Sequence, residues 1–455
     1  MSQEVVEVMQ AVKYHSYPEY TNTGLTWLGA IPKHWGLKRA KFVFKRVQRP
    51  VRVEDDIVTA FRDGQVTLRS NRRTEGFTNA LQEIGYQGVR SGDLLIHAMD
   101  GFAGAIGISD SEGKCSPVCS VCIPISAESV NPYYYGYLVR QLAVTGFITS
   151  LSKGIRERST EFRFSEFSPL ELALPPVDEQ HIIAAFLDYE TARIDRLIAQ
   201  QQRLIELLKE KRQAVISHAV TKGLNPDAPM KDSGVEWIGQ VPEHWVISPL
   251  KYKCVFSGGG TPSKDNLEYW NGSIPWVSPK DMKSFWITDA EDKITEQAIK
   301  ESSTKLVQPG AVLMVVRSGI LQRTIPVGMN TIPVTMNQDM KAIRFSSDVY
   351  AEWLSFFIKG YEDSLLLDWR KQGATVESIE HEYLANSLML FPPEEEARSI
   401  IAALGRRLDK FDQLEQRASD AITLLQERRT ALISAAVTGK IDLRGWTQPA
   451  EEVAA

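Results

Sequence analysis

Arginine and asparagine side chains lie close together in one short segment, and their types suit the recognition of nucleic-acid bases. The segment reads Arg69-Ser70-Asn71-Arg72-Arg73. A guanidinium group can donate two parallel hydrogen bonds to guanine, and an asparagine amide can both donate to and accept from adenine. We therefore predict a base-reading loop that contains Arg69, Asn71, Arg72 and Arg73.

The charge around this segment supports the same chemistry. Residues 37–73 hold eleven Lys or Arg against four Asp or Glu, although the whole chain has a formal net charge of -5. A local basic patch in an acidic protein is what contact with phosphates requires; the alternative is a solvated charged surface. A second basic segment adds three candidates: Lys153, Arg156 and Arg158.

Signatures of catalysis are missing from the sequence. There is no GxxxxGK[ST] phosphate loop and no HExxH zinc motif, and the segment Asn131-Pro132-Tyr133-Tyr134 lacks the second proline of the motif that amino-methyltransferases use. Cys115, Cys119 and Cys122 have spacings that a metal could use, but no fourth ligand is evident, which favours core cysteines. We expect a chain that binds and does not catalyse, with no catalytic residue and no metal site.

The elements that must position the candidate residues occur twice. A motif of the form Trp-Leu/Ile-Gly-x-Ile/Val-Pro-x-His-Trp spans Trp27 to Trp35 and recurs at Trp237 to Trp245. In each half, a Pro-Pro pair at 175–176 or 392–393 precedes a long helical stretch. The chain is therefore a duplicated unit, and each copy is a globular domain followed by a helix.

Both helical stretches contain heptad patterns typical of coiled coils. Their predicted seams share a 3-4 spacing, which is weaker in the first helix. In the first helix the seam residues are Leu187, Glu190, Ile194, Leu197, Gln201, Leu204, Leu208, Lys211, Val215 and His218. In the second they are Ile401, Leu404, Leu408, Phe411, Glu415, Ala418, Ile422, Leu425, Arg429, Leu432 and Ala436.

Connectivity predicts how these helices pair. The first carries the chain from one globular domain to the other, and the second must return antiparallel to bury its seam. With their ends level, Asp178 lies opposite Val437 or Thr438, and Gln201 lies opposite Glu415, where an amide and a carboxylate could specify the register. Alternatively, both residues lie at the solvent edge of the seam, or the helices pack on their own domains instead.

Length and composition set the outer limits. The chain has 455 residues and four cysteines, and short mainly apolar runs alternate with helical stretches in each globular part. These features predict mixed α/β domains in a cytoplasmic protein without a membrane span. We expect target-binding domains at 1–175 and 224–391, spacer helices at 176–223 and 392–442, and a tail at 443–455.

At this point the motifs resemble the specificity subunit of Type I restriction-modification systems. The resemblance rests on the duplicated Trp-to-Trp motif and on further segments in the second half: Gly259-Gly260-Thr261-Pro262-Ser263, Tyr269-Trp270-Asn271-Gly272, Asn337-Gln338-Asp339 and Gly373-Ala374-Thr375 before Phe391-Pro392-Pro393. It implies an α/β fold with two target recognition domains, separated by two long antiparallel coiled-coil helices in a pseudo-two-fold internal repeat.

The resemblance also implies partners. Each domain would read one half of a split double-stranded DNA target, two methyltransferase subunits would dock on the helices, and restriction/translocase subunits would complete the complex. S-adenosylmethionine, ATP and Mg would belong to those partners, with no cofactor bound by this chain. The rival interpretation is a two-headed protein-binding scaffold.

The first half lacks the Gly-Gly-Thr-Pro-Ser and Tyr-Trp-Asn-Gly runs, so the two domains should read different half-sites. In the second domain the DNA-contacting candidates are Lys264, Ser278, Lys280, Asp281, Arg317, Ser318, Arg323, Asn337, Gln338, Lys371 and Gln372. Trp276 is a candidate core residue.

Overall fold

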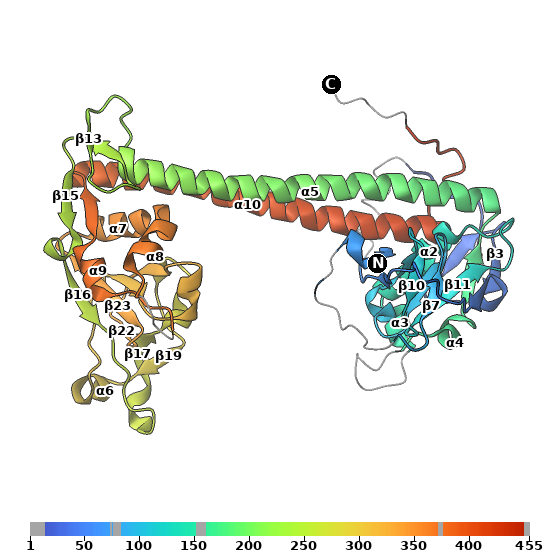
Figure 1. Cartoon of the computed structure of the whole chain (residues 1–455), viewed down its shortest axis with the longest axis horizontal. Coiled ribbons are helices and arrows are strands. Elements are labelled where there is room, and N and C mark those ends of the chain that lie inside the picture. The colour runs from blue at the N-terminus through green and yellow to red at the C-terminus, as the bar shows by residue number, and fades with distance from the viewer. Residues whose placement is uncertain (1–13, 73–74, 76–82, 152–160, 372–375, 450–455) are drawn as a thin grey trace. The chain divides into compact units, whose positions relative to one another are not determined.

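A computed structural model describes residues 14–72, 75, 83–151, 161–371 and 376–449. The chain folds into two compact units. Unit 1 contains residues 1–201 and 420–455, and unit 2 contains residues 202–419. Two long helices are shared between them: α5 (Val177–Lys222) and α10 (Glu394–Val437) (Figure 1).

Unit 1 is built on a four-stranded antiparallel sheet in the order β4-β11-β8-β9. Two-stranded antiparallel pairs β1-β2, β3-β12, β5-β6 and β7-β10 surround it. The strands are β1 (Tyr20–Asn22), β2 (Ala30–Pro32), β3 (Gly36–Arg39), β4 (Phe44–Val47), β5 (Val58–Ala60), β6 (Val66–Leu68), β7 (Gln87–Val89), β8 (Leu94–His97), β9 (Ile106–Ile108), β10 (Gly113–Cys115), β11 (Cys119–Pro124) and β12 (Glu171–Leu174). The short helices are α2 (Pro132–Val144), α3 (Phe147–Ser150) and α4 (Phe164–Phe167).

Unit 2 contains a five-stranded sheet in the order β16-β23-β20-β21-β18 and a three-stranded sheet β19-β17-β22. The pairs β18-β21 and β17-β22 are parallel, and the other pairs are antiparallel. The strands are β13 (Met230–Asp232), β14 (Gln240–Pro242), β15 (Val246–Pro249), β16 (Cys254–Gly258), β17 (Trp270–Val277), β18 (Trp286–Ile287), β19 (Asp292–Ile294), β20 (Val312–Val315), β21 (Val327–Asn330), β22 (Thr335–Met336), β23 (Met340–Phe345) and β24 (Leu388–Phe391). The helices are α6 (Glu296–Glu301), α7 (Asp348–Gly360), α8 (Glu362–Trp369) and α9 (His381–Asn386). The predicted mixed α/β fold is confirmed.

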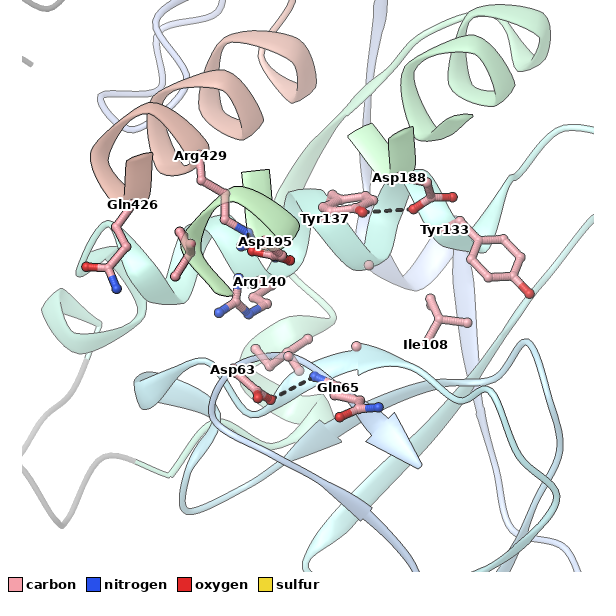
Figure 2. A pocket seen from close by; sticks show the side chains of 15 residues that line it. Asp63, Gln65, Ile108, Tyr133, Tyr137, Arg140, Asp188, Asp195, Gln426 and Arg429 are labelled. Carbon is pink, nitrogen blue, oxygen red and sulfur yellow. Dashed lines mark hydrogen bonds and ion pairs between the residues drawn. The ribbon is translucent and has the colours of Figure 1, made fainter. Parts of the chain in front are cut away.

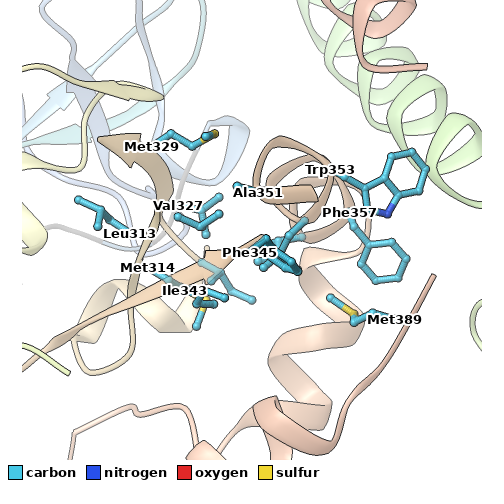
Figure 3. Packing of buried hydrophobic residues seen from close by; sticks show 14 of the residues in the cluster. Leu313, Met314, Val327, Met329, Ile343, Phe345, Ala351, Trp353, Phe357 and Met389 are labelled. Atoms are coloured by element: carbon cyan, nitrogen blue, oxygen red, sulfur yellow. The ribbon is translucent and has the colours of Figure 1, made fainter. Parts of the chain in front are cut away.

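Each unit has its own hydrophobic core, and both long helices contribute residues to each core. In unit 2 the core lies between β20, β23 and α7, where Leu313, Ile343 and Phe357 are fully buried (Figure 3). Ile216 and Val220 from the end of α5 belong to the same cluster. In unit 1 the start of α5 and the end of α10 are likewise part of the core. Unit 1 is therefore built from two separate segments of the chain, whereas unit 2 is one contiguous segment.

The seam predicted for α10 is confirmed, and the seam predicted for α5 is half right. Every predicted α10 seam residue is buried or half-buried. In α5, Leu187, Ile194 and Leu208 are buried as expected, but Leu197 and Leu204 are 38% and 41% exposed. Their neighbours Ile198 and Ile205 face inward instead, so the alternate seam positions are shifted by one residue.

The two helices run antiparallel within each unit. In unit 1, Arg429 Nε donates to Asp195 Oδ1 at 3.1 Å, and Ile198 and Gln426 line the same cavity. In unit 2, Arg212 pairs with Asp412, while Gly223 lies against Ile400. As the residue number rises along α5, it falls along α10.

These contacts overturn the predicted register. Asp195 pairs with Arg429 in unit 1. Gln201 lies six residues after Asp195, so in an antiparallel pair it is level with Thr423, which lies six residues before Arg429. By the same rule, Glu415 is level with Lys209 in unit 2. The pairing of Gln201 with Glu415 is therefore wrong, because the first turns of each helix contact their own globular part and pairing with the other helix begins later.

A carboxylate, buried in unit 1 and half-buried in unit 2, joins the first turn of each long helix to its globular part. In unit 1, Glu179 Oε2 accepts hydrogen bonds from Tyr17 Oη at 2.9 Å and Trp35 Nε1 at 3.0 Å, and Glu179 Oε1 lies 2.6 Å from His34 Nε2. Burial, followed by the bond to Glu179, raises the pKa of Tyr17. We call this arrangement the glutamate clasp.

Unit 2 repeats the clasp with equivalent residues. Glu396 Oε1 accepts from Trp245 Nε1 at 3.1 Å, and Glu396 Oε2 lies 2.7 Å from His244 Nε2. The His-Trp pair that closes the duplicated motif is thus the part that binds the helix. A carboxylate in the first turn also suits the positive end of the helix dipole.

The C-terminal ends of the helices contact the same motif. Lys222 Nζ donates to the carbonyl of Gln240, and Lys440 Nζ donates to the carbonyl of Ala30. Gly223 and Gly439 have φ of +70° and +68°, a left-handed conformation in which glycine commonly ends a helix. α10 therefore ends at Val437, five residues before the predicted boundary at 442.

No helix in the described ranges combines the length and the apolar character that a bilayer span needs.

The clasp predicts a large effect of one substitution on unit 1. Glu179→Ala leaves the buried Tyr17 hydroxyl and Trp35 N–H without an acceptor, which should cost about 3 kcal/mol of the free energy of unfolding. Differential scanning calorimetry should then record a fall of roughly 6–12 °C in the unit 1 transition. The matched control is Asp178→Ala, an exposed acidic neighbour that loses only its interaction with the helix dipole, about 0.5 kcal/mol. Equal effects of the two variants would contradict the role of the clasp.

Candidate nucleic-acid interface

The predicted base-reading segment of unit 1 lies beside the β5-β6 hairpin. Residues Arg69–Asn71 form a single turn of 3-10 helix. Asn71 Nδ2 donates to Thr67 Oγ1 at 3.0 Å, and Arg69 Nε donates to Thr59 Oγ1 at 3.0 Å. Both side chains are therefore oriented by threonines of the hairpin, and the prediction that they contact bases remains a prediction.

Arg72 is held by two interactions at once. Its guanidinium forms an ion pair with Asp63 and lies 4.3 Å from the centre of the Phe61 ring. Burial works against the charge of Asp63, but hydrogen bonds from Arg72 and from the Gln65 N–H hold the pKa of this carboxyl below its ordinary value. Arg72 would have to leave Asp63 before it could pair with a phosphate or a base.

Behind this hairpin lies a cavity of about 670 Å³ within unit 1 (Figure 2). Its carboxylates have partners: Tyr137 Oη donates to Asp188 at 2.8 Å, and Asp195 pairs with Arg429. Arg140 differs, because its Nε is buried without a hydrogen-bond partner in the described part of the chain. Burial, followed by the charge of Arg429, lowers the pKa of Arg140. The sequence analysis missed Arg140, since nothing distinguishes it within α2.

In unit 2 the predicted residues 278–281 form a local turn. Ser278 N and Oγ both donate to Asp281 Oδ2, at 2.8 and 2.7 Å, and this pair caps a 3-10 turn. Lys280 pairs with Asp292 at 3.0 Å and with Glu291 at 3.3 Å. The structure thus accounts for Ser278 and Asp281 as residues that stabilise this turn.

A second cluster brings together two segments that resemble the specificity family and a third segment that contains the candidate Arg317. Asn337 is only 7% exposed, and its Oδ1 accepts from the Asp339 N–H at 3.0 Å. Asp339 in turn accepts from Arg317 Nε at 2.6 Å, and the Thr261 hydroxyl bonds to Gln338. Residues around 261, 317 and 338 therefore meet, although they are distant in the sequence.

Glycine is required in this cluster because the backbones approach closely. A Cβ atom at Gly259 would lie 1.9 Å from the Asn337 carbonyl oxygen, and one at Gly260 would lie 2.7 Å from Ser303. Trp276 Nε1 donates to the Gly260 carbonyl at 2.9 Å. Trp276 is 6% exposed, as expected of a core residue. The Gly-Gly-Thr run of unit 2 is thus a packing motif.

The remaining candidates differ in their surroundings. Lys264 and Arg323 are exposed and have no ion-pair partner in the described ranges, whereas Lys371 pairs with Glu380 at 3.2 Å. The Ser318 hydroxyl accepts from the Ile320 N–H at 3.4 Å. Arg73, Lys153, Arg156, Arg158 and Gln372 lie outside the described residues.

The alternative chemistries considered from the sequence have structural explanations. Asn131 caps α2, with its side chain accepting from the Tyr133 N–H, and it is buried. Burial raises the pKa of the Cys122 thiol to about 12, as expected of a core cysteine. Among the described residues, no group of three or more His, Cys, Asp and Glu could hold a metal ion.

Comparison with known proteins defines the class of domain. A family model described as the Type I restriction modification DNA specificity domain matches residues 242–424, most of unit 2. Most of unit 2 is therefore similar to this family of DNA specificity domains. The resemblance found in the sequence is confirmed.

Individual relatives agree with this class. The chain is 38% identical over 166 residues to the specificity subunit of the Type I restriction enzyme EcoR124I/EcoR124II of Escherichia coli, which covers 36% of this chain and 40% of that one. It is 31% identical over 173 residues to the MjaIX specificity subunit of Methanocaldococcus jannaschii, covering 37% and 38%. The chain thus matches about two fifths of the length of these relatives.

Solved structures share the fold. One of them comes from a structural study of complex assembly and conformational transition of the type I R-M system. It has a TM-score of 0.69 and 17% identity, and the match covers 90% of this chain and 98% of that chain. The HsdS subunit from Thermoanaerobacter tengcongensis has a TM-score of 0.56 and 17% identity, with the same coverage.

The buried Arg140 Nε, which has no hydrogen-bond partner in the described ranges, predicts that Arg140→Met stabilises unit 1. Removing this largely desolvated cation should raise the free energy of unfolding by about 1 kcal/mol, measured by calorimetry as a higher unit 1 transition. The control is Arg196→Met, an exposed arginine of α5 with no ion-pair partner in the described ranges, for which we expect a change within about 0.5 kcal/mol. Destabilisation by Arg140→Met would mean that the arginine has a partner in solution.

Proposed function

We propose that this chain is a non-catalytic specificity subunit that reads a bipartite DNA target for a Type I restriction-modification complex. The observation that carries the proposal is the match of residues 242–424 to the DNA specificity domain family. The exposed cations Lys264 and Arg323 of unit 2 supply charge for phosphate contact.

The internal repeat supports two DNA-recognition domains on one chain. Both units clasp a glutamate of a long helix with a His-Trp pair, so both are built on one plan. They differ in the segments that the second domain alone possesses, such as Gly259 to Ser263. On this proposal each unit reads its own half of the target.

The partners follow from the same proposal. Methyltransferase subunits would dock on the long helices, where Leu204 and Leu207 of α5 are 41% and 45% exposed. Apolar side chains exposed on a helix favour a protein partner. Restriction/translocase subunits, S-adenosylmethionine, ATP and Mg would belong to the remainder of the complex, in the cytoplasm. This chain would determine which DNA sequence is bound and would catalyse no reaction.

The decisive experiment compares DNA methylation in cells with and without this gene, in the presence of the methyltransferase partner. Loss of methylation at one split sequence is the expected result, and that sequence then serves as the probe for binding. A methylation pattern that does not depend on the gene would reject the proposal. The protein-scaffold alternative predicts that outcome.

Domain exchange tests whether each domain recognises its own half of the target. Replacing residues 224–391 with the corresponding domain of a relative should change one half of the methylated sequence and leave the other half intact. The physical reason is that each unit has its own core and its own candidate contact residues. A chimera that alters both halves would contradict independent reading.

Arginine substitutions test individual contacts. Arg72→Ala or Arg317→Ala should cost about 1–3 kcal/mol on the specific site if the residue reads a base, with relaxed preference at that position. Loss of a phosphate contact should instead weaken all sequences alike and lower the salt slope by about one unit. Fluorescence anisotropy over a range of salt concentrations distinguishes these results. Unchanged affinity and slope would assign that arginine to its ion pair with Asp63 or Asp339.

A further inference from the structure

Five cations lie in one short segment of unit 1. The segment consists of β3, the 3-10 turn Ala40–Phe42 and β4, and we call its exposed surface the β3-β4 face. Its cations are Lys38, Arg39, Lys41, Lys45 and Arg46. All five are exposed, and none has an ion-pair partner in the described ranges. The nearest acid on the paired strand is Glu171, which lies opposite Arg39.

Four arginines elsewhere in the basic segment 37–73 are neutralised. Each of these arginines pairs with a carboxylate: Arg49 with Asp93, Arg52 with Glu112, Arg62 with Asp100 and Arg72 with Asp63. The sequence spreads its positive charge over the whole segment. In the described part of the segment, the five cations of the β3-β4 face have no ion-pair partner.

Unit 2 provides an internal comparison, because its matching elements lie 210 residues further along the chain. β15, the turn Leu250–Tyr252 and β16 correspond to β3, Ala40–Phe42 and β4. The positions of Lys38, Arg39, Lys45 and Arg46 are taken there by Ser248, Pro249, Val255 and Phe256. The basic character of the face is therefore a property of unit 1 and not of the fold.

Unit 2 keeps lysines on these elements only where they have local contacts. Lys251 Nζ donates to Asn386 Oδ1 at 2.6 Å, and Lys253 Nζ lies 5.6 Å from the centre of the Phe391 ring. Val255 is 71% exposed at the position of Lys45. The surface thus offers a polyanion five exposed cations in unit 1 and only two, Lys251 and Lys253, in unit 2.

We propose that the β3-β4 face binds the phosphate backbone of DNA, so that unit 1 has a salt-dependent contact that the matching surface of unit 2 does not provide. The inference rests on the proposed function, which provides DNA as the polyanion. It goes further by assigning unequal roles to the two units. β4 is an edge strand of its sheet, and lysines on edges also prevent strand pairing between molecules. That second role makes no contribution to DNA binding, so the two are separable by experiment.

The test uses the full chain with its methyltransferase partner and duplexes with and without the methylated target. For Lys38→Gln/Arg39→Gln the slope of log K against log salt should fall by about 1.8 units, since each lost phosphate contact contributes about 0.9. Both duplexes should lose affinity by the same factor, which leaves the preference for the target unchanged. The matched control is Lys251→Gln/Lys253→Gln, which removes the same charge from unit 2 and should change the slope by less than about 0.5.

A second double variant, Lys45→Gln/Arg46→Gln, keeps the test valid if the first variant does not fold. Circular dichroism verifies that both variants are folded. Unchanged slopes for both unit 1 variants, with DNA binding of the unaltered chain intact, would overturn the inference and leave the proposed function standing. Loss of assembly with the methyltransferase at an unchanged slope would identify an acidic protein as the occupant and also overturn it. Absence of DNA binding by the unaltered complex would reject both the inference and the proposed function.

Discussion

The glutamate clasp is the interaction on which the rest of this structure depends. Glu179 and Glu396 lie in the first turns of α5 and α10, and each is bound by a His-Trp pair of its own globular part. Glu179 is buried, and a buried carboxylate is costly unless its oxygens are hydrogen-bonded, so the pairing favours one position on α5. The clasp therefore sets where each long helix leaves its unit.

Helix pairing follows from the clasp. Because the first turns are occupied by contacts with the globular part, pairing between α5 and α10 starts further along each helix. The ion pairs Asp195–Arg429 and Arg212–Asp412 report one common register in the two units. The other ends are closed by Lys222 and Lys440, which reach the carbonyls of Gln240 and Ala30 in the duplicated motif. The motif thus binds the start of one helix and the end of the other.

On this common frame the two units carry different surfaces. Unit 1 presents the β3-β4 face and a hairpin whose Arg72 is paired with Asp63. Unit 2 instead gathers residues around Thr261, Arg317 and Gln338 into a tightly packed cluster. A duplicated scaffold with different surfaces suits a protein that must recognise two unlike halves of one target.

The sequence by itself determined the features that are local or periodic. The repeat, the two long helices, the seam of α10 and the mixed α/β class could all be predicted, because heptad spacing and glycine or proline boundaries act within a few residues of the chain. The same is true of Trp276 as a core residue. Family resemblance was also available, since it depends on motifs such as Trp237 to Trp245.

Only the tertiary structure decided the features that join distant residues. The helix register depends on Glu179 and Glu396 contacting residues more than a hundred positions away, which no helical pattern encodes. Which cations remain free depends on acids such as Asp93 and Asp100 being folded against Arg49 and Arg62. Composition counts charges, but electrostatic interactions are short in range in water, so the fold determines which charges are left for a partner.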